Sequence, residues 1–82
     1  MAAVLPRFSV STTRVNTRNQ FKGTVISLRR GDVMSELEIE TSAGVISAVI
    51  TTSSVERLQL RVGDSALALF KAADVLVAKL DE

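Results

Sequence analysis

Apolar and polar residues alternate along much of the chain, which is the pattern of strands with one buried face. The clearest case is SELEIE, residues 35–40, where we expect Leu37 and Ile39 to face the core and the glutamates to face water. Residues 45–51, VISAVIT, are β-branched and almost continuously apolar, which predicts a strand covered on both faces.

Three further segments are predicted strands. Residues 21–28, FKGTVISL, indicate a strand with a bulge or a close backbone approach at Gly23. Residues 66–71, ALALFK, and residues 75–80, VLVAKL, are short apolar runs separated by Ala72-Ala73-Asp74.

The period changes in residues 52–60, TSSVERLQL, which predict a short helix. Ser53 is followed three residues later by Glu56, and this spacing is typical of a capping box. The expected inner stripe consists of Val55, Leu58 and Leu60.

Five short strands with a helix between the third and fourth predict a mainly β fold. Turn signals lie at Gly31-Asp32, at residues 41–44 and at Gly63-Asp64. A five-stranded Greek-key barrel of the oligonucleotide/oligosaccharide-binding type fits this order best. Residues 16–82 are then one domain, and residues 1–15 are an N-terminal extension, either a tail or an added edge strand with RFSVST as its core.

The composition limits the chemistry. The chain has 82 residues and contains neither Cys nor His, so thiolate and imidazole metal ligands and the usual general base are missing. Apolar residues make up 46% of the chain, a surplus for a small domain that suggests burial against other copies. The apolar runs are too short to span a membrane, and the absence of Cys fits a reducing cytoplasm.

Charge is distributed unevenly, although the net charge is only +1. Residues 1–30 contain six Lys or Arg and no acid, whereas all nine acids lie from Asp32 onward. This asymmetry favours an anionic partner near the first third of the chain. The alternative is a basic segment that is solvated or paired with the acidic remainder.

Several function classes find little support. We expect no enzyme, because the nucleophile motifs GxSxG and SxxK are absent. The glutamates of residues 35–40 indicate a solvated strand face rather than a metal site. Binding of single-stranded nucleic acid needs stacking aromatics, and the chain has three Phe, no Tyr and no Trp.

A small oxyanion matches the chain better. Arg18 lies among short hydrogen-bonding side chains in NTRN, and Lys71 lies at the end of a predicted strand. Ala72 and Ala73 leave the backbone N–H groups after Lys71 open to an approaching anion. A few charge-assisted hydrogen bonds of this kind are enough to hold a small oxyanion. Each segment alone is also compatible with an ordinary strand end.

The sequence resembles the molbindins, the Mop-type molybdate-binding proteins whose domain is called TOBE. Matching segments are TRNQFKGTVISLRRGDVMSELEIE, GVISAVITTSSVERLQLRVGD and ALALFKAADVLVAKL. The resemblance implies a cytoplasmic binder of molybdate or tungstate that stores the ion and assembles as a hexamer, a trimer of dimers, with oxyanions at subunit interfaces. Nucleic acid and membrane are not expected partners.

The resemblance also implies site residues. Arg18 and Lys71 match the family's cations, which we expect from different chains at an interface, and Thr51 matches a family threonine. The family's Ser-Ala and its late hydroxyl are replaced here by Asn16-Thr17 and Ala73. Further implied positions are Ala72 as a contact through its backbone, Asn19 and Gln20 as supports, and Met34 and Ser35 as a second site.

Two other classes remain open. The chain could be a regulatory or sensor module of a molybdate transport or transcription-control system. It could also be a structural barrel or nucleic-acid binder with a degenerate anion site.

Overall fold

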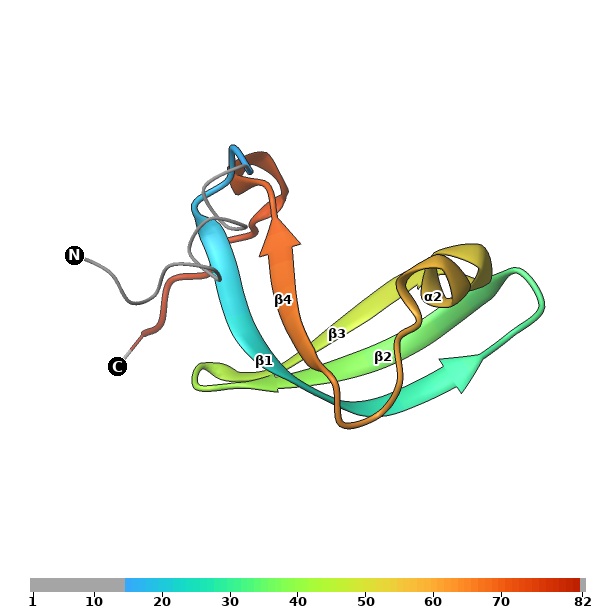
Figure 1. The fold of residues 1–82 in the computed structure, drawn as a ribbon. Coiled ribbons are helices and arrows are strands. Elements are labelled where there is room, and N and C mark those ends of the chain that lie inside the picture. Colours follow the sequence, from blue (N-terminus) through green and yellow to red (C-terminus); the bar gives the residue numbers. More distant parts are fainter. Residues whose placement is uncertain (1–14, 82) are drawn as a thin grey trace. The chain divides into compact units, whose positions relative to one another are not determined.

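A computed structural model describes residues 15–81, and this part of the chain contains four strands, one α-helix and one short 3₁₀-helix. The elements are β1 (Asn19–Arg30), β2 (Met34–Thr41), β3 (Gly44–Thr51), α2 (Thr52–Leu58), β4 (Ser65–Phe70) and η1 (Ala72–Asp74). The strands form one sheet in the order β3-β2-β1-β4 (Figure 1). The mainly β class and the helix between the third and fourth strands are confirmed.

The fifth strand is wrong for the described part of the chain. Residues 75–80 belong to no strand there, and the side chains of Leu76 and Val77 are 95% and 91% exposed. Alternation shows which face of a segment is apolar, but a strand also needs a neighbour for its backbone hydrogen bonds. The predicted edge strand at residues 7–12 lies outside the described residues.

The chain divides into two compact units. One comprises residues 21–68, and the other contains residues 15–20 and 69–81 of the described chain. The larger unit holds the core, and the smaller unit holds the segments around Arg18 and Lys71.

The core of the larger unit forms where strand alternation predicted it. Leu37 and Ile39 of β2 are each 4% exposed, and Val25 of β1 is fully buried beside Ala68 of β4. The expectation for SELEIE is therefore confirmed. Half-buried apolar residues surround this cluster: Phe21, Leu28, Ile46, Ala48, Ile50, Leu60 and Ala66.

Strands β1 and β2 are antiparallel and approach closely at Gly23. This residue is opposite Thr41, and a Cβ there would overlap the carbonyl oxygen of Glu40 and come within 2.8 Å of Ile39 Cγ2. The close backbone approach is thus confirmed. The bulge lies elsewhere, because the register shifts between Val25 and Ser27.

Strand β3 is covered on one face only, so the expectation of a doubly covered strand is wrong for this chain. Ile46, Ala48 and Ile50 are half-buried against the core, whereas Val45 and Val49 are 52% and 61% exposed. The continuous apolar run hid an alternation, because both faces of β3 carry apolar side chains. β3 is also at the edge of the sheet.

Helix α2 begins two residues earlier than the capping-box pattern indicated. Thr51 is the N-cap, and its Oγ1 accepts a hydrogen bond from the backbone N–H of Ser54 at 3.1 Å. Glu56 accepts instead from Arg30 at 2.7 Å. Four consecutive hydroxyl residues precede Val55, and any of them is a competent cap, so the spacing to Glu56 selected the wrong one.

The apolar stripe of α2 is narrower than expected. Val55 is 1% exposed, but Leu58 is 63% exposed, so its predicted inward position is wrong. The helix ends at Gln59, whose φ of 55° is left-handed, and this reversal returns Leu60 to the core. Among the predicted turns, Gly63 has a φ of 100°, a conformation that glycine adopts easily.

Candidate functional site

The site residues expected from the sequence fall in both units. The smaller unit contains Asn16, Thr17, Arg18, Lys71, Ala72 and Ala73. The larger unit contains Thr51, Met34 and Ser35.

In the smaller unit, one hydroxyl joins the two basic segments. Thr17 Oγ1 donates a hydrogen bond to the carbonyl oxygen of Phe70 at 2.6 Å and accepts one from the N–H of Asn19 at 3.2 Å. Arg18 follows Thr17 and Lys71 follows Phe70, and both are exposed. The segments that carry the two candidate cations therefore lie side by side in one chain, 53 residues apart in sequence.

Hydrogen bonds within the turn fix the backbone on both sides of Arg18. The side chain of Gln20 donates to the carbonyl oxygen of Thr17 at 2.5 Å, and the N–H of Gln20 donates to the carbonyl oxygen of Arg18 at 3.1 Å. The Thr17 hydroxyl hydrogen is used within the protein. Thr17 therefore braces the turn in this structure, and direct contact with an anion stays a prediction.

The chain turns sharply after β4. Lys71 caps η1, in which the N–H of Asp74 donates to the carbonyl oxygen of Lys71 at 2.9 Å. The first N–H groups of a helical turn have no acceptor inside it. Ala72 and Ala73 occupy these positions and are exposed, so their N–H groups are suited to an anion beside Lys71.

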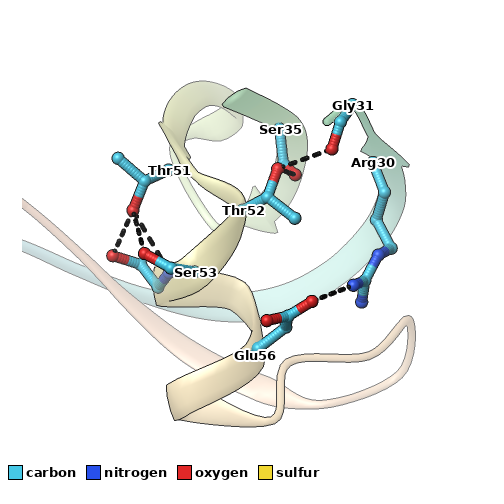
Figure 2. A network of polar contacts seen from close by, with 8 residues as sticks. Arg30, Gly31, Ser35, Thr51, Thr52, Ser53 and Glu56 are labelled. Carbon is cyan, nitrogen blue, oxygen red and sulfur yellow. Dashed lines mark hydrogen bonds and ion pairs between the residues drawn. The ribbon is translucent and has the colours of Figure 1, made fainter. Parts of the chain in front are cut away.

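In the larger unit, three hydroxyl side chains gather at the start of α2. Thr51 Oγ1 lies 2.8 Å from Ser54 Oγ and 3.3 Å from Ser53 Oγ (Figure 2). An Arg57 guanidinium nitrogen donates to Ser54 Oγ at 3.0 Å. We did not expect Ser53 or Ser54 beside Thr51, although the run TTSS was a signal for a cluster of hydroxyls.

The two second-site candidates differ in exposure. Met34 is 47% exposed and pairs with Thr51 across β2 and β3. Ser35 is only 1% exposed, and its Oγ lies 2.7 Å from Thr52 Oγ1. The Ser35 hydroxyl is therefore directed into the protein.

The chemistry of these groups is that of anion binding. Guanidinium, ammonium, hydroxyl and backbone N–H groups are all hydrogen-bond donors, and the cations add charge. Within residues 15–81 no three acidic side chains gather to hold a metal ion, and Glu36 pairs with Arg29 at 3.6 Å. No helix in that range is long and apolar enough to cross a membrane.

Comparison with known proteins relates this arrangement to molybdenum proteins. The chain is 37% identical to a probable molybdenum-pterin-binding protein of Haemophilus influenzae, over 78% of this chain and 94% of that protein. It is 42% identical to the molybdenum transport protein ModE of Azotobacter vinelandii, over 78% of this chain but only 24% of that longer protein.

Solved structures agree with the sequence relatives. A molybdate-binding protein from Sporomusa ovata superposes with a TM-score of 0.76 at 34% identity, covering 79% of this chain and 97% of that one. The cytoplasmic molybdate-binding protein ModG, with molybdate bound, gives a TM-score of 0.68 at 40% identity, covering 72% and 43%. The TOBE domain model matches residues 16–77, and the chain belongs to the TOBE domain family, with Mop-type molybdate-binding proteins among its relatives.

Proposed function

We propose that this chain binds molybdate reversibly, with tungstate as a competitor, and serves as a cytoplasmic store rather than as an enzyme. The observation that carries this proposal is the Thr17–Phe70 hydrogen bond, which sets the segments of Arg18 and Lys71 side by side. Relatives that are named for molybdate binding support the choice of ion.

The proposed site lies at a two-fold contact between copies. A two-fold axis brings the same surface of two chains together, so a contact through the smaller unit gathers two Arg18 and two Lys71. Four cations repel one another unless anions lie between them. A dianion between Arg18 of one chain and Lys71 of its partner offsets this repulsion, and three such dimers form the proposed hexamer.

The neighbouring groups complete the shell of donors. The backbone N–H groups of Ala72 and Ala73 and the side chain of Asn16 are proposed to bind oxygens of the ion. Asn19 and Gln20 support the turn. Thr51 is proposed to contribute its hydroxyl, and Met34 and Ser35 mark a second class of site at the β1–β2 turn.

Calorimetric titration with molybdate tests the function. We expect the wild type to bind with a free energy on the order of −8 kcal/mol, or more favourably. Arg18→Ala removes a charge-assisted contact and is expected to weaken binding at least about tenfold. Lys79→Ala is the matched control, because Lys79 is an exposed cation outside the proposed site.

Companion titrations define selectivity. Tungstate should displace molybdate, whereas sulfate and phosphate report on general anion binding. An oligo-dT titration tests the nucleic-acid alternative. No heat with molybdate at millimolar concentration would contradict the proposed function, and an unchanged Arg18→Ala isotherm would remove Arg18 from the site.

The similarity to ModE favours one second candidate, a sensor module of a regulatory system. The two roles differ in capacity. A store that is overproduced in cells should raise their molybdenum content in proportion to the protein, whereas a sensor leaves that content unchanged. Elemental analysis of overproducing cells, with the Arg18→Ala variant as reference, separates the roles.

A further inference from the structure

A chain of buried hydroxyls connects the β1–β2 turn to the start of α2. Thr52 Oγ1 donates to the carbonyl oxygen of Gly31 at 2.8 Å, and Ser35 Oγ lies 2.7 Å from Thr52 Oγ1 (Figure 2). A threonine hydroxyl has one hydrogen, and that of Thr52 is used on Gly31. Ser35 must therefore be the donor to Thr52, so the direction of both hydrogen bonds is fixed.

Backbone hydrogen bonds reinforce the same connection. The N–H of Thr52 donates to the carbonyl oxygen of Val33 at 2.8 Å, and the N–H of Gly31 donates to the carbonyl oxygen of Met34 at 3.0 Å. Thr52 thus holds the turn at two carbonyl groups. Thr52 and Ser35 are 8% and 1% exposed, so water competes little for these bonds.

The connected residues flank two candidate oxyanion contacts. Thr51 directly precedes Thr52, and Met34 directly precedes Ser35. Thr51 and Met34 are also opposite each other in the β2–β3 register. A shift of the turn would therefore move both contacts together.

We propose that Thr52 and Ser35 are positioning residues for oxyanion binding, because their hydroxyl chain holds the β1–β2 turn and the start of α2 as one rigid block. Neither side chain touches the ion. The block presents the Thr51 hydroxyl, and the turn around Met34, in fixed positions. This inference rests on the proposed function, since it concerns the geometry of the same binding groups.

Thr52→Val tests the proposal, because it keeps the shape of the side chain and removes only its hydroxyl. Ser35 then loses its acceptor and Gly31 loses its donor. We expect molybdate binding to weaken about tenfold, the lower end of the effect seen when a residue that orients a ligand group is lost. Ser35→Ala, which leaves the Thr52–Gly31 bond intact, should have a smaller effect.

Val55→Ala is the matched control. Val55 is a buried residue of the same helix and makes no part of the hydroxyl chain. It should reduce the free energy of unfolding without reducing affinity, provided that all titrations use temperatures at which every variant is folded. A merely structural role for Thr52 predicts equal affinities for Thr52→Val and Val55→Ala.

Amide hydrogen exchange gives a second measurement. Thr52→Val should speed exchange at Gly31 and Thr52 more than Val55→Ala does. A wild type that binds molybdate, with affinity unchanged in Thr52→Val, would overturn the positioning role and leave the proposed function standing. A wild type that binds no molybdate would overturn both.

Discussion

Gly23 is the residue at which a single atom decides the packing of two strands. It lies in β1 opposite Thr41, where a side chain would meet the β2 backbone at Glu40. The backbone of β2 cannot yield as a flexible side chain can. We therefore expect Gly23→Ala to reduce the free energy of unfolding by about 3 kcal/mol, the upper part of the usual cost of overpacking.

Urea unfolding measures this cost, with Thr24→Ala as the control. Thr24 is the next residue of β1 and is exposed, so its truncation should change stability by less than about 0.5 kcal/mol. Equal midpoints for the two variants would show that β2 moves aside more easily than its hydrogen bonds suggest.

Residues of the candidate site were predictable to different degrees. Arg18 and Lys71 stood out because an isolated cation beside small polar or apolar residues has few structural reasons to be there. The bracing bond from Thr17 to Phe70 was not predictable, since it joins residues 53 apart and alternation carries no information on such pairs. The commitment of Ser35 to Thr52 was hidden for the same reason.

At the scale of elements, α2 depends on the Thr51 cap. The helix has seven residues, so the few bonds at its first turn matter. Thr51→Ala should cost about 1 kcal/mol of stability, whereas Thr51→Ser keeps the capping oxygen and should cost far less. Thermal unfolding without molybdate measures this difference, and equal melting temperatures for the two variants would contradict the capping role.

Strands with one buried face were predicted well, and strands with two apolar faces were not. Leu37 and Ile39 were assigned correctly because the glutamates between them leave one choice of inner face. In β3 both faces carry apolar side chains, so the pattern cannot show which face lacks a cover. The start of α2 was missed because neighbouring hydroxyl residues are chemically equivalent as caps.

At the scale of the whole molecule, exposed apolar side chains support the proposed assembly. Leu76 is 95% exposed at the end of the chain, and Val49 is 61% exposed on β3. If copies associate through the terminal segment, Leu76→Ser should lower the mass measured by light scattering. Lys79→Ser in the same segment should leave it unchanged, and a wild type of monomer mass would contradict the assembly.

Composition anticipated this outcome better than periodicity did. An apolar fraction of 46% exceeds what the small core of this chain buries, and that surplus appears as exposed residues of β3 and residues 75–80. The fifth strand was wrong because a strand is defined by its partner, which a pattern within the segment cannot supply.

The uncharged edge of the sheet has a consequence for handling the protein. β3, GVISAVIT, has no lysine, glutamate or proline to discourage another chain from adding to its free hydrogen-bonding groups. Any treatment that separates the copies, such as dilution, chelation of the ligand or a surface substitution, exposes an adhesive rim. Dissociated chains should then precipitate or form fibrils instead of persisting as soluble single molecules.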